Sequence, residues 1–303
     1  MIVAEQLTKR FGDKTAVSQV SFTVQPGKVT GFLGPNGAGK STTMRMIVGL
    51  DRPTAGIVTV NGKPYAQLRA PLTEVGVLLD AKAVHTGRSA RNHLRAMAAT
   101  HGIGRARVDE VIELTGLASV ANKRAGKFSL GMGQRLGIAA ALLGDPHTVI
   151  LDEPVNGLDP EGVRWVRQFV RHLAGEGRTV LLSSHLMSEM SQTADHVIVL
   201  GRGKVLADAE LSELVSAWTS NTVRVRSPRL AELVAAVAGP DVTVTATEPG
   251  LADINGVTAA SLGDLAASLG IPVHELTPRT GSLEEAYLAL TGEAVEYKSK
   301  EIA

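Results

Sequence analysis

The sequence has no cysteine, almost no net charge and no long apolar run, and each absence removes a class of protein. Without cysteine, the chain forms no disulfide bond and no cysteine-ligated metal site. Its 31 Lys and Arg residues balance 30 Asp and Glu residues, giving a formal net charge of +1. This balance does not indicate a nucleic-acid partner. The longest apolar stretch, near LGIAAALLG at 136–144, is far below the roughly 20 residues that span a bilayer.

The first residues, MIVAEQLTKRFGDK, lack the basic-then-apolar order of a signal peptide. We therefore expect a chain that is soluble by itself and that works at a membrane only by docking on another chain. Its 303 residues, 44% of them hydrophobic, suffice for one large domain or for a domain of about 200 residues plus a smaller one.

The order of strand-like and helix-like segments predicts an α/β fold. IVAEQL, AVSQVSFTV, KVTGFLG and GIVTVNG predict antiparallel strands around a glycine loop. Residues 85–144 are mostly helical in pattern and predict a helical insertion. Further on, the strands HTVILDEP, TVLLSS and HVIVL alternate with helices and end at a hairpin turn, GRGK. This alternation favours a mostly parallel sheet.

The pattern changes after about residue 220. Strand and helix signals then follow the order β-α-β-β-α-β plus one helix, which resembles a ferredoxin-like unit. We predict a first domain at residues 1–215, a small α+β accessory domain at 220–292 and a polar tail at 293–303.

A glycine-rich loop between a predicted strand and a predicted helix carries the clearest chemical signal. Glycine lets the backbone approach a ligand closely, and the loop amides and the helix N-terminus favour an anion. In the motif G-x-x-x-x-G-K-[ST], the lysine reaches the outer phosphates of a nucleotide and the hydroxyl holds Mg²⁺. The alternative, a glycine-rich turn with a surface lysine, fits the strand–loop–helix context poorly. The motif residues are Gly34, Pro35, Asn36, Gly37, Ala38, Gly39, Lys40 and Ser41.

Two carboxylates, Asp152 and Glu153, follow the apolar run VIL. They therefore come at the carboxyl end of a buried strand, where ligands of open α/β sheets bind. Asp152 would hold Mg²⁺ directly or through water, and Glu153 would orient and polarise an attacking water. The alternative is a pair of helix-capping residues on a loop. Capping does not explain why two acidic residues directly follow a fully apolar strand.

Taken in order, the motifs resemble those of the nucleotide-binding subunit of ATP-binding cassette (ABC) transporters, over residues 1–215. GPNGAGKST resembles the phosphate loop of this family, and VILDEP its carboxylate motif. FSLGMGQRLGIA at 128–139 resembles the signature, whose commonest form is LSGGQ followed by QR. NGLDP at 156–160 resembles the loop at the dimer seam, and SSH at 183–185 the strand-end histidine.

The resemblance implies ATP and Mg²⁺ as cofactors and gives roles to further residues. Ser129 and Gly131 would contact the γ-phosphate held by a second copy, although Ser129 also fits a helix cap. Asp159 fits a cap before Pro160, with the dimer-seam role added. His185 would contact the γ-phosphate, whereas a lone histidine after an apolar strand is more often simply packed.

Three other positions are assigned less directly. Phe11 lies where the family places an aromatic residue that stacks on adenine, and a core phenylalanine is the alternative. Thr42 would add a hydroxyl near the α-phosphate. Asp80 aligns with a glutamine of the family, and it can accept a metal or a water but cannot donate an amide hydrogen. The signature also departs from LSGGQ, with Leu130 and Met132 in place of glycine and glutamine.

The resemblance implies an ATPase subunit at the cytoplasmic face of the cell membrane, peripheral to a separate permease and paired with a second nucleotide-binding subunit, as in a homodimer. FSLGMGQRLG and LTPRTGSLEEAYLALTG resemble subunits of drug- and antibiotic-efflux exporters. A soluble ABC ATPase with a mechanical or regulatory role is the alternative, although such relatives usually carry coiled-coil inserts or two cassettes. A phosphotransferase would not need the signature or SSH.

Overall fold

The computed structural model describes residues 1–303 except 82, 219–221, 241, 280–281 and 292–303. The predicted polar tail at 293–303 lies outside the described residues. The chain divides into two compact units. One comprises Met1–Leu211 with the described residues from Ala289, and the other comprises Ser212–Leu288.

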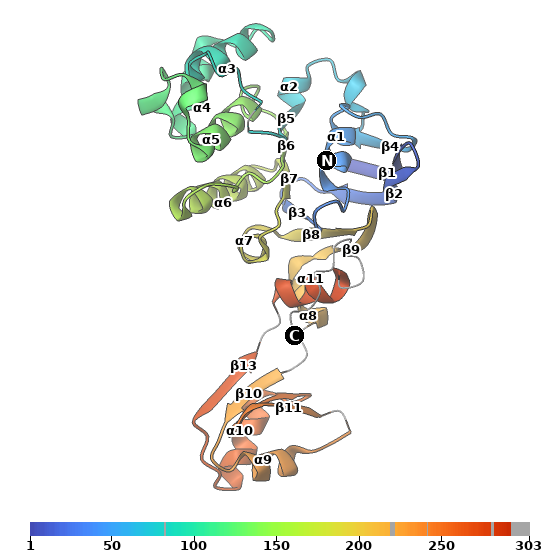
Figure 1. The fold of residues 1–303 in the computed structure, drawn as a ribbon, viewed down its shortest axis with the longest axis vertical. Coiled ribbons are helices and arrows are strands. Elements are labelled where there is room, and N and C mark those ends of the chain that lie inside the picture. Colours follow the sequence, from blue (N-terminus) through green and yellow to red (C-terminus); the bar gives the residue numbers. More distant parts are fainter. Residues whose placement is uncertain (82, 219–221, 241, 280–281, 292–303) are drawn as a thin grey trace. The chain divides into compact units, whose positions relative to one another are not determined.

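The first unit contains two sheets (Figure 1). Its strands are β1 (Ile2–Phe11), β2 (Lys14–Val24), β3 (Val29–Leu33), β4 (Ala55–Val60), β5 (Val75–Leu78), β6 (Thr148–Leu151), β7 (Thr179–Ser183), β8 (His196–Gly201) and β9 (Lys204–Glu210). Its helices are α1 (Lys40–Ile47), α2 (Pro71–Glu74), α3 (Ala90–Ala99), α4 (Arg105–Leu114), α5 (Leu130–Ala141), α6 (Pro160–Gly175) and α7 (Met187–Thr193). Short 3₁₀ turns lie at Tyr65–Gln67, Ala118–Val120 and Ala125–Lys127.

The larger sheet has the strand order β5-β6-β7-β3-β8-β9, and all neighbours are parallel except the antiparallel hairpin β8–β9. The smaller sheet, β2-β1-β4, is antiparallel. The expected mostly parallel sheet and the hairpin at GRGK are confirmed. The inclusion of KVTGFLG among the antiparallel strands was wrong, because β3 lies between β7 and β8. Every residue of β3 is buried, as is typical of parallel strands covered on both faces.

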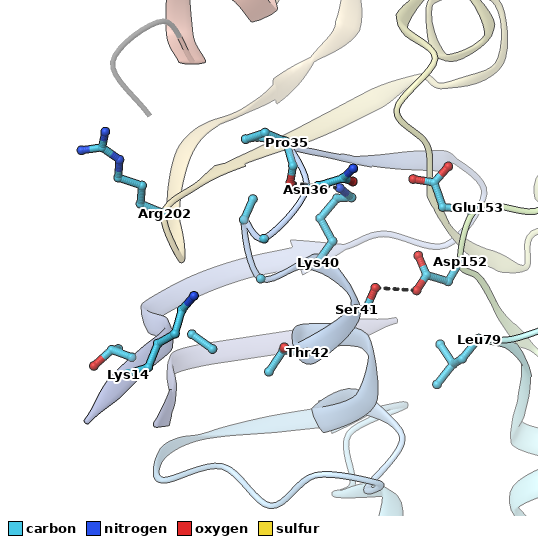
Figure 2. Close-up of a pocket in the computed structure, with 15 residues that line it drawn as sticks. Lys14, Pro35, Asn36, Lys40, Ser41, Thr42, Leu79, Asp152, Glu153 and Arg202 are labelled. Carbon is cyan, nitrogen blue, oxygen red and sulfur yellow. Dashed lines mark hydrogen bonds between the residues drawn. The ribbon is translucent and has the colours of Figure 1, made fainter. Parts of the chain in front are cut away.

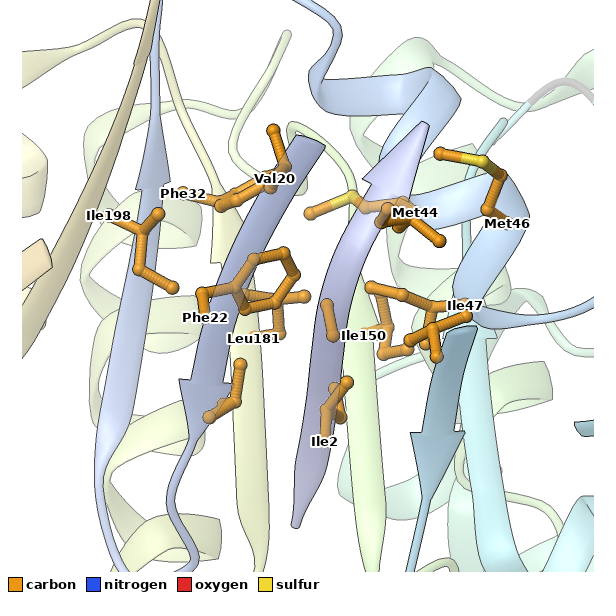
Figure 3. Packing of buried hydrophobic residues seen from close by; sticks show 14 of the residues in the cluster. Ile2, Val20, Phe22, Phe32, Met44, Met46, Ile47, Ile150, Leu181 and Ile198 are labelled. Atoms are coloured by element: carbon orange, nitrogen blue, oxygen red, sulfur yellow. The ribbon is translucent and has the colours of Figure 1, made fainter. Parts of the chain in front are cut away.

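A hydrophobic core joins the two sheets to α1 (Figure 3). The antiparallel sheet contributes Ile2 and Phe22, and the parallel sheet contributes Phe32. The rings of Phe22 and Phe32 lie 5.5 Å apart between centroids. Met44 and Ile47 of α1 are fully buried in the same cluster. Apolar packing against both sheets therefore holds α1 in place. The glycine loop is fixed in turn, because it leads directly into this helix.

Between β5 and β6 the chain forms α3, α4 and α5, which cluster beside the sheet (Figure 1). The hydroxyl of Ser89 caps α3 by accepting a hydrogen bond from the Asn92 amide at 3.2 Å. Within the described ranges, no helix reaches the length and hydropathy needed to cross a bilayer.

The second unit has the ferredoxin-like order that the sequence predicts. The elements of this region are α8 (Leu211–Trp218), β10 (Thr222–Arg226), α9 (Leu230–Val237), β11 (Thr243–Glu248), β12 (Leu251–Asn255), α10 (Ala259–Ser268), β13 (Glu275–Arg279) and α11 (Leu283–Thr291). The strands form an antiparallel sheet in the order β11-β12-β10-β13, with α9 between β10 and β11 and α10 between β12 and β13. The core of this unit includes Val223, Leu233, Ile254 and Leu262.

The separate cores lead to a prediction about folding. We expect a chain that ends at residue 215 to melt in one cooperative transition and to bind nucleotide, because the glycine loop and its supporting core lie before that point. Calorimetry and nucleotide titration would check this. An aggregated or non-cooperative product would show that the accessory domain is integral to the first.

Candidate active site

Three neighbouring strands of the parallel sheet deliver the candidate residues to one edge. Strands β6, β7 and β3 are adjacent and parallel, so their carboxyl ends lie together. The glycine loop follows β3, Asp152 and Glu153 follow β6, and His185 comes two residues after β7. Residues that are more than 100 positions apart in the sequence therefore meet at this edge.

The glycine loop is shaped by close contacts that a side chain would block. Gly39 has a φ of 102°, and a Cβ there would lie 2.7 Å from the carbonyl oxygen of Ala16. A Cβ on Gly34 would lie 2.6 Å from the carbonyl oxygen of Leu200. The loop is thus pressed between β2 and the end of β8, which leaves its other side open to a ligand.

A cavity of about 610 Å³ opens over this loop (Figure 2). Glycine-loop residues form its floor, and Asp152 and Glu153 form one wall. The sequence did not mark several other lining residues, which come from β2, the segment after β5 and the β8–β9 turn. These are Lys14, Thr15, Ala16, Leu79 and Arg202.

The Lys40 side chain is buried and curls over its own loop. Its Nζ donates to the Gly34 carbonyl at 2.6 Å and more weakly to the Pro35 carbonyl at 3.4 Å. Burial lowers the pKa of the Lys40 ammonium, whereas the carboxylates of Glu153 and Asp152 act to raise it. The ammonium is therefore held in place by the backbone, at a position where an anionic ligand would compensate its burial.

The Asp152 carboxylate links the glycine loop to two strands. Its Oδ2 accepts a hydrogen bond from the Ser41 hydroxyl at 2.8 Å, and its Oδ1 accepts one from the Ser183 hydroxyl. A hydroxyl and a carboxylate at this spacing are the kind of oxygen donors that Mg²⁺ prefers. Together with the glycine cradle and Lys40, they fit a nucleotide triphosphate with its metal ion.

Glu153 is fixed on every side. Its φ of 50° lies in the left-handed region, which is sparsely populated for a residue with a side chain. Its backbone N–H donates to the Ser183 hydroxyl at 2.9 Å, and its carbonyl accepts from the buried Gln134 amide at 3.2 Å. Its carboxylate Oε2 lies 2.7 Å from His185 Nδ1. These contacts hold the backbone and the carboxylate of a residue that lines the cavity.

His185 is exposed and pairs with Glu153, so the alternative of a merely packed histidine is wrong. Its predicted contact with a γ-phosphate stays a prediction.

Both capping alternatives are confirmed. The Ser129 hydroxyl accepts a hydrogen bond from the Met132 amide at 3.3 Å and caps α5. The Asp159 carboxylate accepts from the Gly162 amide at 2.9 Å and caps α6. Ser129 is exposed, and neither Ser129 nor Gly131 lines the cavity of the same chain. Their proposed contact therefore needs a partner outside this cavity.

Phe11 and Asp80, like Gly34, His185, Ser129 and Gly131, are not among the residues that line the cavity. Phe11 is 51% exposed, so the core alternative is wrong, and Lys9 Nζ lies 4.9 Å from its ring centroid. Asp80 is exposed, and its carbonyl accepts a hydrogen bond from the Ala83 amide. Thr42 does line the cavity. The metal role of Asp80 and the adenine role of Phe11 stay predictions.

Comparison with known proteins identifies the family. A family model described as "ABC transporter" matches residues 17–156. The chain is 34% identical, over 306 residues and 96% of each chain, to the uncharacterized ABC transporter ATP-binding protein YhcH of Bacillus subtilis. The chain belongs to the ABC transporter ATP-binding family. It is an ATP-binding and ATP-hydrolysing subunit of an ABC transporter.

Other relatives of this ABC subunit are named for antibiotic transport or resistance. The bacitracin transport ATP-binding protein BcrA of Bacillus licheniformis is 41% identical over 217 residues, 71% of each chain. The daunorubicin resistance ATP-binding protein DrrA3 of Streptomyces coeruleorubidus is 33% identical over 303 residues, 96% of each chain. Residues 221–284 match a model described as a domain of unknown function (DUF8746).

Solved structures share the ABC fold. An ATP-binding subunit of an ABC transporter aligns with a TM-score of 0.63 at 26% identity, covering 72% of this chain and 93% of that chain. The bacterial ABC transporter cassette MJ0796, solved as a dimer, aligns with a TM-score of 0.64 at 25% identity, covering 70% of this chain and 99% of that chain.

The position of Lys40 leads to a binding prediction. We expect Lys40→Ala to weaken ATP binding by about 10- to 100-fold, the range for losing a hydrogen bond to a charged group. Isothermal titration would measure it, with Lys63→Ala as a control because Lys63 is exposed and does not line the cavity. Unchanged affinity in Lys40→Ala would contradict the assignment.

Ser183 gives a second prediction, because its hydroxyl serves both carboxylate residues. We expect Ser183→Ala to lower the free energy of unfolding by about 1–3 kcal/mol, the cost of leaving the partly buried Glu153 amide unpaired. Turnover should fall by a larger factor than ATP affinity. The neighbour Ser184, whose hydroxyl accepts a hydrogen bond from the Leu186 amide at 3.0 Å, provides Ser184→Ala as the control. Equal turnover in the two variants would refute this role.

Proposed function

We propose that the protein powers the export of a drug- or antibiotic-like compound through a separate membrane permease by hydrolysing Mg²⁺-bound ATP. The observation that carries the proposal is the meeting of Lys40, the Ser41–Asp152 pair and Glu153 around one cavity. Lys40 and the loop amides supply positive charge for phosphates, and the carboxylates supply a metal site and a base. The names of the bacitracin and daunorubicin relatives support the class of cargo.

Each residue has a defined task in this reaction. Lys40 and the amides of the glycine loop bind and orient the outer phosphates. Ser41 and Asp152 would hold Mg²⁺, which supplies charge neutralisation on the phosphate oxygens when bound. Glu153 orients a water molecule and accepts its proton, and His185, which is 2.7 Å from Glu153 Oε2, fixes the direction of that carboxylate.

A second copy would complete the site. Ser129 and Gly131 stand at the exposed N-terminus of α5, outside the cavity of their own chain. A capped helix N-terminus favours an anion, so in a head-to-tail pair this end would face the γ-phosphate held by the other copy. The dimeric state of the solved MJ0796 cassette supports such a pair. The permease would place the pair at the cytoplasmic face of the membrane.

The test separates binding from hydrolysis. Glu153→Gln keeps the size and hydrogen bonding of the side chain but removes its charge. We expect turnover to fall by a factor on the order of 10² to 10⁴, the range for a positioned general base. ATP binding should survive, because Lys40, Ser41 and the loop amides hold the phosphates without Glu153. The variant should then accumulate as an ATP-bound dimer, visible by light scattering.

A second substitution provides the control for the dimer. Ser129→Arg places a bulky side chain at the end of α5 and should abolish dimerisation in the Glu153→Gln background while leaving ATP binding to the monomer intact. A Glu153→Gln variant that stays monomeric at saturating ATP and Mg²⁺, both alone and with the permease, would reject the two-copy site. Wild-type turnover in Glu153→Gln would reject the catalytic assignment.

A further inference from the structure

A second cavity, of about 320 Å³, lies where the end of α3 meets the start of α4. The two helices pack against each other in the helical insertion (Figure 1). Two arginines, Arg95 and Arg105, line this cavity together with apolar residues and one glycine. It shares no lining residue with the nucleotide cavity. This is therefore a separate feature of the helical insertion.

The backbone around this cavity is held by a tight connection. The carbonyl of Ala98 accepts hydrogen bonds from the His101 amide at 3.1 Å and from the Ile103 amide at 2.9 Å, which ends α3. Gly102, with a φ of 69°, lets the chain reverse there. Small residues at the helix ends, among them Ala98 and Gly104, leave room between the helices. The cavity thus follows from the local sequence.

The arginines of α3 and α4 differ in how their charges are compensated. Arg91 and Arg107 each form an ion pair with a carboxylate of α4. For Arg95 and Arg105, no ion pair or hydrogen bond of the guanidinium is recorded among the described residues, and Arg95 Nε is buried without a partner. Among the described residues that line the cavity, none is acidic. Two uncompensated cations therefore face one cavity.

The helix ends do not account for both cations. Arg95 lies near the C-terminal end of α3, where partial negative charge favours a cation. Arg105 is the first residue of α4, where the partial charge is positive and a cation is disfavoured. Gly104, the N-cap, has no side chain to cap the helix, and the first turn of this fully described helix contains no acidic residue. An anion in the cavity would compensate Arg105 as well as Arg95.

We propose that this cavity binds a phosphate monoester through Arg95 and Arg105. Such a group carries a charge of about −1.5 to −2 near neutral pH, which matches two guanidinium groups better than the single charge of a carboxylate does. A guanidinium can donate two parallel hydrogen bonds to phosphate oxygens. The apolar lining, which includes Ile103 and Val108, suits the carbon part of an ester. The ester is either a soluble molecule or a lipid headgroup, and the inference is independent of the proposed function.

The experiment uses the full chain with saturating ADP and Mg²⁺ to occupy the nucleotide cavity. Glycerol 3-phosphate is titrated by calorimetry, and phosphatidylcholine vesicles with or without phosphatidic acid are tested by co-sedimentation. We expect Arg95→Gln and Arg105→Gln each to weaken binding about 3- to 30-fold, less than the full range for charged hydrogen bonds because solvent reaches both side chains. Neither residue lines the nucleotide cavity, so retained ATP turnover shows that the variants are folded.

Two controls separate this cavity from other sources of phosphate binding. Arg91→Gln removes the same charge one helical turn before Arg95, from a residue that has its own acidic partner and does not line the cavity. This variant should bind both probes as the wild type does. Lys40→Ala removes the ammonium of the glycine loop and should also retain glycerol 3-phosphate binding.

Binding of the soluble ester alone would identify a soluble ligand, and binding only to vesicles with phosphatidic acid would identify a lipid headgroup. Either result supports the site if Arg95→Gln and Arg105→Gln lose it. Wild-type protein that binds neither probe would overturn the inference. Loss in Lys40→Ala, with full binding in both arginine variants, would place the phosphate in the glycine loop and overturn it. An equal loss in Arg91→Gln would show general charge attraction and also overturn it.

Discussion

The carboxylate of Asp152 holds together the elements on which the site depends. One oxygen accepts from Ser41 at the start of α1, and the other accepts from Ser183 at the end of β7. Three separate segments are therefore tied through one side chain. The position of α1 is set by the core, because the helix packs against both sheets. The Ser41–Asp152 hydrogen bond then fixes the start of α1 relative to the edge of the parallel sheet. The site is as rigid as the core that carries it.

At the same edge of the sheet, Glu153 has a strained, left-handed backbone conformation. Glu153 keeps a left-handed φ of 50° because Ser183 accepts its N–H and Gln134 donates to its carbonyl. Such a conformation persists only where the surroundings over-determine it. Gln134 belongs to α5 of the helical cluster, so a shift of α5 would disturb the backbone of Glu153 directly. This hydrogen bond directly connects the helical cluster to the residue proposed as the general base.

The sequence predicted those parts of the site that depend on local pattern. The glycine loop, the two carboxylates and the caps at Ser129 and Asp159 follow from short motifs whose geometry is determined within a few residues. The parallel sheet and the ferredoxin-like order follow from the alternation of strands and helices. The family was recognised from the order of several motifs along one chain, because no single motif identifies it.

What the sequence could not predict depends on neighbours far away in the chain. Ser183 stood in the motif SSH, yet its bonds to two carboxylate residues appear only when β6 and β7 pair. Arg202 lines the cavity at the GRGK turn, whose Gly203 bonds to the glycine loop. The sequence marks the turn but does not show which distant segment the turn contacts. KVTGFLG was misplaced for a similar reason, because an apolar run shows burial but does not show which sheet buries it.

One of the two departures in the signature, Leu130, packs within its own chain. Leu130 stands where the family pattern has glycine, and it fills the space above Gly157. A Cβ at position 157 would lie 2.2 Å from Leu130 Cδ2. Gly157 also has a φ of 73°, so glycine is the residue that fits both the backbone and the contact. The added leucine thus packs the signature onto the loop that resembles the dimer seam, while Ser129 still caps α5 and Gly131 still lies close to Leu158. Ser129 and Gly131, the two residues proposed to contact the nucleotide of a second copy, are thus both kept beside this packed leucine.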